Sequence, residues 1–204
     1  MSSSRDLILG RVRDALAALP KRAPLPEWDP AGARSTVAPS GADLWQAFSA
    51  RLRAVNGTPL ASVAELVALL DSKGWRHGYC DPTLWLALKA AFPAGFTVET
   101  EFDRSRVDDY QFGITAADGA IAETGTLVLS DRGTASRLAA LAPWVHVAAI
   151  RHAQIVPDLG SALTLLGNDP NVIWVTGPSK TADVEGILIE GVHGPGMQVA
   201  LLLD

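Results

Sequence analysis

The sequence predicts a three-layer α/β domain in which helices flank a mostly parallel sheet. Segments with strand character alternate with segments of helical periodicity, which is the order that parallel strands joined by right-handed crossovers require. The runs Val145–Ile150 and Val199–Leu203 are continuously apolar, as expected for strands covered on both faces. With 204 residues, 48% of them hydrophobic, the chain is long and apolar enough to bury one core of this kind.

Residues 1–40 predict an amphipathic helix followed by a proline-rich arm. The apolar residues of the helix recur on one face, and they are Leu7, Ile8, Val12, Leu16 and Leu19. Pro20 ends the helix, and the further prolines up to Pro39 exclude regular structure in the arm. The apolar face must pack against something, either its own domain, which is the favoured expectation, or a partner chain.

Residues 41–204 form the predicted domain, and its elements follow in chain order. Helices are expected over 44–55, over 62–73 after the capping pair Ser62 and Glu65, and from the N-cap Asp81 onward. Further helical patterns lie near 134–141 and 157–166. Strands are expected at 75–79, 96–100, 120–130, 145–150, 172–176 and 198–203.

The composition excludes several functional classes. A formal net charge of −5 provides no basic face of the kind that duplex nucleic acid requires. Cys80 is the only cysteine, so the chain can form neither an internal disulfide nor a four-thiolate cluster site, and its four histidines lack metal-site spacing. No apolar run approaches the ~18–20 residues that span a bilayer, and the first residues match no targeting signal. We therefore expect a cytoplasmic protein with no metal or cofactor of its own.

The segment 113–129 is rich in small residues and carries two carboxylates, Asp118 and Glu123. Glu123 alternates with Ile121, so its carboxylate is expected to point toward a buried face, where it needs a partner or a catalytic role. Thr124-Gly125 suits neither common two-residue hairpin turn, so the chain is expected to bend there in a less common way. The alternative is that Glu123 only fixes this bend by accepting backbone N–H bonds.

The segment Thr176–Asp183 follows a predicted strand, at the end where open α/β sheets place ligands. Its backbone N–H groups, its hydroxyls and Lys180 suit a phosphate or a carboxylate. The segment lacks the first glycine of a Walker A loop. The alternative is an ordinary turn leading into a helix, with Asp183 near the cap.

A glycine-rich loop, Gly191–Gly196, holds His193 just before the last strand. A histidine in this position can bind a ligand or transfer protons, and the alternative is that it bonds only to loop carbonyls. His146 lies within an apolar strand and is expected to be a hydrogen-bonded core residue. Glu123 is the candidate catalytic residue, and the candidate ligand-binding residues are Thr115, Asp118, Thr124, Gly125, Thr126, Thr176, Gly177, Ser179, Lys180, Thr181, Asp183 and His193.

Four stretches, in this order along the chain, resemble the short form of the LUD-domain family of lactate-utilisation proteins. They are GITAADGAIAETGT at 113–126, APWVHVAAIRHAQIVPDL at 142–159, TGPSKTADVE at 176–185 and GVHGPGMQVALLLD at 191–204. The resemblance covers about the C-terminal half of the chain. It implies a fold similar to the ribose-phosphate isomerase and CoA-transferase group, and a role in bacterial L-lactate utilisation.

The resemblance also implies partner subunits that carry iron–sulfur clusters, while this chain carries none. We therefore expect an accessory subunit of L-lactate-to-pyruvate oxidation that binds its iron–sulfur partners or a small anionic ligand such as lactate, phosphate or a CoA-like molecule. The alternative is a stand-alone enzyme of acyl or sugar-phosphate chemistry, with Glu123 as nucleophile or base.

Overall fold

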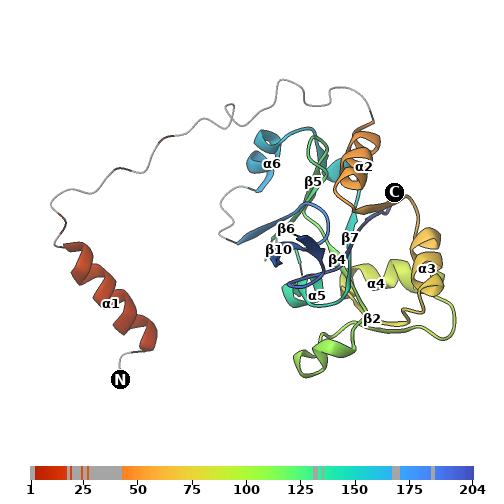
Figure 1. Cartoon of the computed structure of the whole chain (residues 1–204), viewed down its shortest axis with the longest axis horizontal. Coiled ribbons are helices and arrows are strands. Elements are labelled where there is room, and N and C mark those ends of the chain that lie inside the picture. Colours follow the sequence, from red (N-terminus) through yellow and green to blue (C-terminus); the bar gives the residue numbers. More distant parts are fainter. Residues whose placement is uncertain are drawn as a thin grey trace.

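A six-stranded, fully parallel sheet crosses the centre of the computed structural model (Figure 1). The structure describes residues 3–17, 19, 24, 27, 43–130, 133–134, 136–166, 171–184 and 187–204. In spatial order the strands of the sheet are β1 (Thr58–Leu60), β12 (Met197–Leu202), β7 (Val145–Ile150), β4 (Phe112–Ala116), β2 (His77–Cys80) and β3 (Thr97–Glu99). The predicted parallel α/β architecture is confirmed.

One face of this sheet is covered by two helices, α3 (Val63–Ser72) and α4 (Pro82–Leu88). Both begin where the sequence predicts. The Ser62 hydroxyl accepts the backbone N–H of Glu65, and the Asp81 carboxylate accepts that of Thr83 at 2.9 Å. The apolar core beneath them joins the helices to four central strands through Leu66, Leu70, Cys80, Leu88, Phe112, Ile114, Val145, Val147, Val199 and Leu201.

The opposite face is covered by two helices and by a second, four-stranded sheet. The helices are α2 (Leu44–Ala54) and α5 (Arg137–Leu141), and the second sheet has the order β8 (Ile155–Val156), β5 (Gly119–Ile121), β6 (Thr126–Ser130) and β9 (Val172–Val175). Helix α6 (Leu159–Leu166) packs on β5 and β8. The sequence predicts strand character at 120–130 and 172–176, where β5, β6 and β9 lie, but it predicts neither β8 nor a separate layer formed by these strands.

Some elements differ from the sequence predictions. Strands β1, β4 and β8 were not predicted, nor were the short 3₁₀ helices η2 (Lys89–Ala91), η3 (Arg104–Asp109) and η4 (His152–Gln154). The suggested helix start at 180–184 is wrong, because β10 (Lys180–Val184) and β11 (Ile187–Glu190) form an antiparallel hairpin there. The apolar run Ile187–Ile189 favours a strand, and its partner is the segment that the capping argument assigned to a helix.

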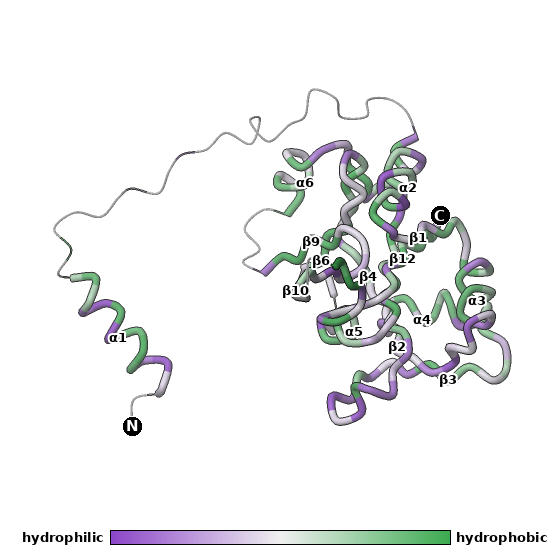
Figure 2. The backbone as a smooth tube through the Cα atoms, in the orientation of Figure 1, coloured by the Kyte–Doolittle hydropathy of each residue, from purple (hydrophilic) through white to green (hydrophobic). Residues whose placement is uncertain are grey.

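Helix α1 (Ser4–Ala17) forms as predicted, with a capping box at its start. The Ser3 hydroxyl accepts the backbone N–H of Asp6, and the Asp6 carboxylate accepts the backbone N–H of Ser3, both at 3.2 Å. Apolar and polar residues alternate along the helix (Figure 2). It contains no buried residue, and because the arm that joins it to the domain lies largely outside the described residues, the expected packing of its apolar face on its own domain stays a prediction. Most of the predicted arm lies outside the described residues.

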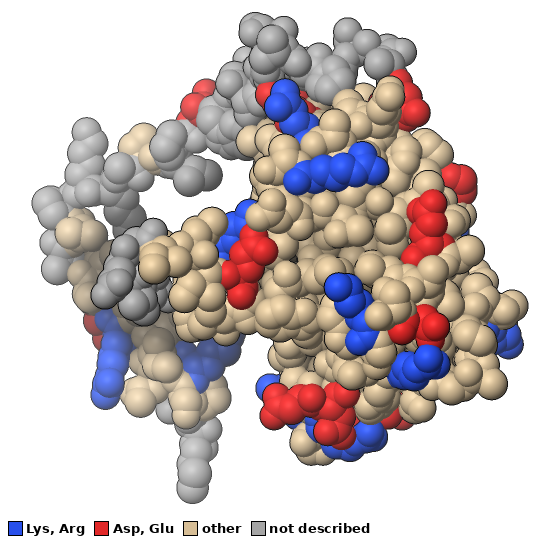
Figure 3. Space-filling model, turned by 45° about the vertical axis from the view of Figure 1, so that its right-hand side comes forward, with Lys and Arg blue, Asp and Glu red and all other residues tan. Residues whose placement is uncertain are grey.

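Surface charge is mixed in sign and scattered on the face that Figure 3 presents. Within the part of the chain that the structure describes, no helix combines the length and the apolar character needed to cross a bilayer.

Candidate functional site

A hollow of about 390 Å³ lies between the central sheet and β9. It collects parts of two sequence-predicted motifs, because Thr176, Gly177 and Ser179 line it together with His193. The remaining lining residues were not predicted, and they are Ala140, Leu141, His146, Ile173, Trp174, Val175, Pro178, Gly194, Pro195 and Gln198. Its walls are mostly apolar and no lysine or arginine lines it, which is typical of a site that binds an uncharged group or a partner's side chains.

His146 and Gln198 line the floor of the hollow, and they belong to a buried chain of polar side chains on three neighbouring strands. His146 on β7 lies between Thr115 on β4 and Gln198 on β12. The Nε2 atom of His146 is 2.9 Å from the Thr115 hydroxyl, and its Nδ1 atom is 2.9 Å from Oε1 of Gln198. All three side chains are buried, so the expected hydrogen-bonded core role of His146 is confirmed.

Burial lowers the pKa of His146 to about 4, against the opposing effect of its bond to Gln198. His146 is therefore neutral at physiological pH. Both of its ring nitrogens already have partners, so the imidazole fixes the three strands relative to one another and presents no spare donor to the hollow.

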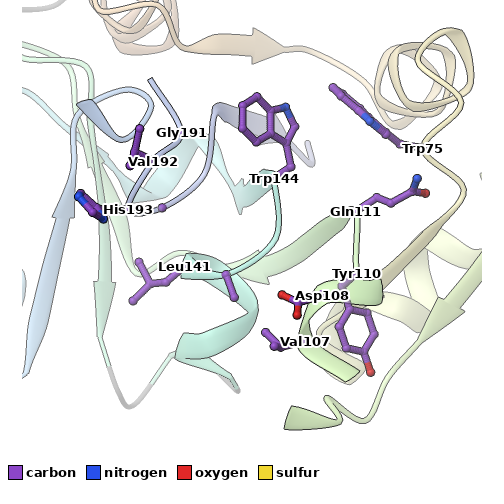
Figure 4. Close-up of a pocket in the computed structure, with 12 residues that line it drawn as sticks. Trp75, Val107, Asp108, Tyr110, Gln111, Leu141, Trp144, Gly191, Val192 and His193 are labelled. Atoms are coloured by element: carbon purple, nitrogen blue, oxygen red, sulfur yellow. The ribbon is translucent and has the colours of Figure 1, made fainter. Parts of the chain in front are cut away.

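A second hollow, of about 480 Å³, adjoins the first and shares Leu141, His193 and Gly194 with it. Figure 4 shows its opening, with Val192 and His193 on one side and Trp75 and Gln111 on the other. Trp144 projects over it from the start of β7, and Asp108 lies on the side opposite to Trp144. His193, which the sequence singles out, thus belongs to the wall between the two hollows.

These hollows lie at the amino ends of the central parallel strands. Trp75, Gln111, Trp144 and Gly196 line or border them; Gln111, Trp144 and Gly196 directly precede β4, β7 and β12, and Trp75 lies two residues before β2. The sequence argument placed the ligand at the carboxyl end of a strand. That argument holds for β9 alone, because β9 belongs to the second sheet and its end reaches the amino edge of the first.

The loop that carries His193 is built around the indole of Trp144. A Cβ atom on Gly191 or Gly196 would lie within 2.6 Å or 2.3 Å of that ring. Gly191 also has φ +83°, a conformation that favours glycine. The glycines of this motif therefore allow close packing on Trp144.

Several other predicted site residues form instead a seat for the end of helix α2. We call this the α2 seat; it consists of Thr124, Gly125, Thr126, Thr176, Gly177 and Lys180. The Lys180 ammonium donates to the Val55 carbonyl at 3.0 Å and pairs with Glu190 at 3.5 Å. A cation at this place stabilises a helix C-terminus, so Lys180 already has partners within its own chain.

The two turns of the α2 seat are held together by a chain of hydroxyl groups. Thr126 lies 2.7 Å from Thr124 and 2.8 Å from Thr176, measured between their Oγ1 atoms. Gly125 at φ +69° and Gly177 at φ +82° allow the turns to approach α2 so closely that a Cβ atom would meet its backbone. The structure therefore brings residues 124–126 of the first motif and residues 176–180 of the second together, and it does so beneath a helix.

The two carboxylates of the first motif lie apart from the hollows. Asp118 accepts the backbone N–H of Ser130 at 2.7 Å, which ties the ends of β5 and β6. Glu123 is half-buried and lies in the turn after β5, closed by a bond from Gly125 N–H to the Ile121 carbonyl, so the predicted unusual bend is present. The expected alternation with Ile121 is wrong, because the strand ends at Ile121. Among the described residues the Glu123 carboxylate has no hydrogen-bond or ion-pair partner.

Two remaining candidate ligand-binding residues, Thr181 and Asp183, lie on the β10–β11 hairpin. The structure also places Cys80 and the possible metal ligands. Thr181 pairs with Ile189 in β10–β11, and Asp183 lies on the same strand. Burial raises the pKa of the Cys80 thiol to about 12, so Cys80 is an unreactive core residue. Within the described ranges no three His, Cys, Asp or Glu side chains are grouped to hold a metal ion.

Sequence reasoning missed Trp144, Trp174 and Gln198 as site residues. Gln198 carried a usable signal, because a glutamine inside a continuously apolar strand requires a buried partner, and His146 is the matching polar residue in β7. The two tryptophans gave no such signal, because their position at the hollows depends on the packing of loops from distant parts of the chain.

A family model described as the LUD domain matches residues 85–203, which is more than half of the chain. Lactate utilization protein C 1 of Bacillus mycoides is 37% identical over 100 residues, which cover 45% of this chain and 43% of that protein. Lactate utilization protein C of an Exiguobacterium species is 42% identical over 91 residues, covering 41% and 40%. The chain thus matches less than half the length of these curated relatives.

A solved structure supports the fold independently. The crystal structure of a DUF162 family protein from Deinococcus radiodurans superposes with a TM-score of 0.59 at 22% sequence identity. The match covers 79% of this chain and 96% of that one.

Proposed function

The chain belongs to the LUD-domain family, and on that premise we propose that it acts in lactate utilisation as an accessory subunit. In this proposal it oxidises no lactate alone and carries no iron–sulfur cluster. It supports a cytoplasmic L-lactate-to-pyruvate oxidation system by binding partner subunits, which carry the clusters, or a small anionic ligand.

The similarity to curated proteins named lactate utilization protein C supports a role in lactate utilisation. The observation that carries the proposed binding role is the hollow between β9 and the central sheet. Residues 176–179 and 193–195, both inside the family match, meet there over the buried His146. A site assembled from separate loops over a fixed polar floor is suited to recognition.

The chemistry of the lining favours a partner's side chains over a free anion. The lining contains Trp174, Ile173 and Leu141, and no lysine or arginine. Lys180, the cation expected to hold an anion, is engaged by Val55 and Glu190. A carboxylate bound here would depend on backbone N–H groups and the Ser179 hydroxyl.

The second candidate function is a stand-alone enzyme with Glu123 as nucleophile or base. One observation favours it: Glu123 is half-buried and has no partner for its carboxylate among the described residues. Against it, Glu123 lines neither hollow described above.

Growth on L-lactate tests the proposal. A strain that lacks this gene is complemented with the wild-type chain or with His193→Trp, which fills the wall between the hollows from an exposed position. We expect the wild type to restore growth on lactate and His193→Trp to fail, while both strains grow on glucose. His152→Trp, at another exposed histidine, is the matched control and should restore growth. Equal growth of all three complemented strains would exclude this site.

A further inference from the structure

A third hollow, of about 490 Å³, is formed by helix α5 and the chain at the start of η3. Its volume falls in the range of small-molecule sites, which is about 300–1,000 Å³. Of its lining residues only Leu141 also lines the first two hollows. The complete lining consists of Phe102, Arg104, Ser136, Arg137, Leu138 and Leu141.

This third hollow differs from the first two in its charge. Arg104 and Arg137 both line it, whereas no lysine or arginine lines either of the others. None of the described carboxylates lines it. Two cations at one hollow repel each other, and an anion bound beside both offsets this repulsion. In a chain of net charge −5, a local concentration of positive charge at a hollow favours an anionic ligand.

Arg104 is placed to bind a ligand at the rim. Its side chain is exposed, and among the described residues its guanidinium has no hydrogen-bond or ion-pair partner. The carboxylate next to it in the sequence, that of Asp103, is engaged by Ser105 instead. It accepts the backbone N–H of Ser105 at 2.8 Å and the hydroxyl of Ser105 at 2.7 Å.

Helix α5 contributes a second charge and a hydroxyl group. Arg137 donates to the Asn171 carbonyl at 3.2 Å, which holds its guanidinium at the wall of the hollow. The Ser136 hydroxyl accepts the backbone N–H of Ala139 at 3.4 Å. Its own proton has no acceptor within the part of the chain that the structure describes, so the hydroxyl can donate to a ligand.

The rest of the lining is an apolar wall that is fixed in position. The Phe102 ring stacks on Tyr110 with the centroids 4.7 Å apart, and it meets the ring of Tyr79 edge-on at 5.6 Å. Tyr110 is buried, and its hydroxyl accepts the backbone N–H of Asp103 at 3.0 Å. The segment that carries Arg104 is thereby held in place before any ligand arrives. The apolar lining residues are Phe102, Leu138 and Leu141.

We propose that the third hollow binds a small organic anion that has a carboxylate or phosphate head and an apolar body. The head lies at Arg104 and Arg137, because a guanidinium pairs with either group through two parallel hydrogen bonds. The body lies against the Phe102 wall, where it is shielded from water. The inference rests on the anionic-ligand part of the proposed function for its biological role, and it assigns that ligand a site apart from Lys180.

Calorimetric titration of the full-length chain at neutral pH tests the site with defined probes. Hexanoate and phenyl phosphate have both a head and an apolar body. L-Lactate and inorganic phosphate have little more than the head, and hexanol has no charge. We expect hexanoate or phenyl phosphate to bind at least about tenfold more tightly than the other three, because only these two use both parts of the hollow. The tighter of the two identifies the head group.

Variants locate the binding. Arg104→Gln removes a charge at an exposed residue, so it should fold normally and bind the tighter probe about tenfold more weakly or worse. Arg53→Gln, at an exposed arginine of α2 outside the hollow, is the matched control and should bind like the wild type. Leu138→Ala should weaken binding of the tighter probe but not of inorganic phosphate. Thermal unfolding of each variant confirms that it is folded.

Three results would overturn the proposal. The first is that no organic anion binds the wild type at millimolar concentration, and the second is that Arg104→Gln binds the probes as tightly as the wild type does. The third is that lactate and inorganic phosphate bind as tightly as hexanoate and phenyl phosphate, because the apolar wall would then be no part of the site. The titrations involve no lactate oxidation, so a failure here leaves the accessory role to the growth test, and a failure there leaves the binding result standing.

Discussion

The Nε2 atom of His146 accepts a hydrogen bond from the Thr115 hydroxyl, at 2.9 Å and out of reach of solvent. The direction of this bond follows from the contact that the other ring nitrogen, Nδ1, makes with Gln198. The Gln198 amide nitrogen donates to the Val199 carbonyl, so its Oε1 atom faces Nδ1 of His146, and that nitrogen must carry the proton. Nε2 is then a bare acceptor. The three side chains are fully paired only while His146 is neutral.

The first prediction is that the protein loses stability in mild acid. His146 titrates at a pKa of about 4 in the folded chain and near 6.5 in the unfolded chain, so the unfolded state binds more protons between these values. The free energy of unfolding should therefore fall as the pH drops from 6.5 to 4, by up to about 3 kcal/mol from this group. Urea unfolding across this pH range measures it.

His146→Asn isolates the contribution of this group. The amide keeps a donor toward Gln198 but does not titrate in this range, so the variant should be less stable at pH 7.5 by about 1–3 kcal/mol while losing less on acidification. His152→Asn, at an exposed histidine that lies 3.6 Å from the Asp204 carboxylate, measures how much a surface histidine contributes to the slope. If His146→Asn loses stability on acidification as steeply as the wild type, the acid sensitivity arises elsewhere.

The second prediction concerns Lys180, which the sequence suggests as an anion ligand. Because its ammonium holds the Val55 carbonyl at the end of α2, Lys180→Met should lower the free energy of unfolding by about 1 kcal/mol. Lys89→Met, at an exposed residue, should change it little. Scanning calorimetry measures the stability of both variants, and calorimetric titration with lactate and phosphate measures their anion binding, so a structural role of Lys180 is separated from a ligand-binding role. If Lys180→Met keeps the wild-type stability but no longer binds anions, Lys180 is an anion ligand and the structural interpretation is wrong.

The third prediction separates two effects of replacing a glycine of positive φ by alanine: backbone strain and steric overlap of the added Cβ atom. Gly125→Ala places a Cβ atom 2.4 Å from the backbone of Leu52 in α2 and also strains φ. Gly74 has a similar φ of +71°, but nothing lies within 4 Å of its Cβ position. We expect Gly74→Ala to cost about 1 kcal/mol and Gly125→Ala clearly more. Equal melting temperatures would show that the 122–125 turn does not press on α2.

The fold was largely predictable because it follows from local patterns. The continuous apolar runs of β7 and β12 and the capping residues Ser62 and Asp81 each predict an element that the structure contains. The site was less predictable, because small residues allow close approach of either a ligand or another part of the chain. Gly125 and Gly177 predict close approach to the backbone, but sequence does not show whether a ligand or helix α2 approaches.

The fourth prediction concerns Glu123. Since its carboxylate accepts no hydrogen bond from the described residues, Glu123→Gln should keep the unfolding free energy within about 0.5 kcal/mol of wild type. Thermal unfolding measures this. The same variant decides between the two candidate functions: lost lactate-dependent growth in a normally folded variant would support the enzyme, and retained growth supports the accessory subunit.

Reconstituted lactate oxidation tests the central claim most directly. Pyruvate formation from L-lactate is measured with the purified chain alone, with iron–sulfur lactate-utilisation proteins as the proposed partners, and with all of them together. The proposed accessory role predicts no pyruvate from the chain alone, and a rate from the complete mixture that falls when the chain is left out or replaced by His193→Trp. Lactate oxidation by the chain alone, or an equal rate without it, would contradict that role.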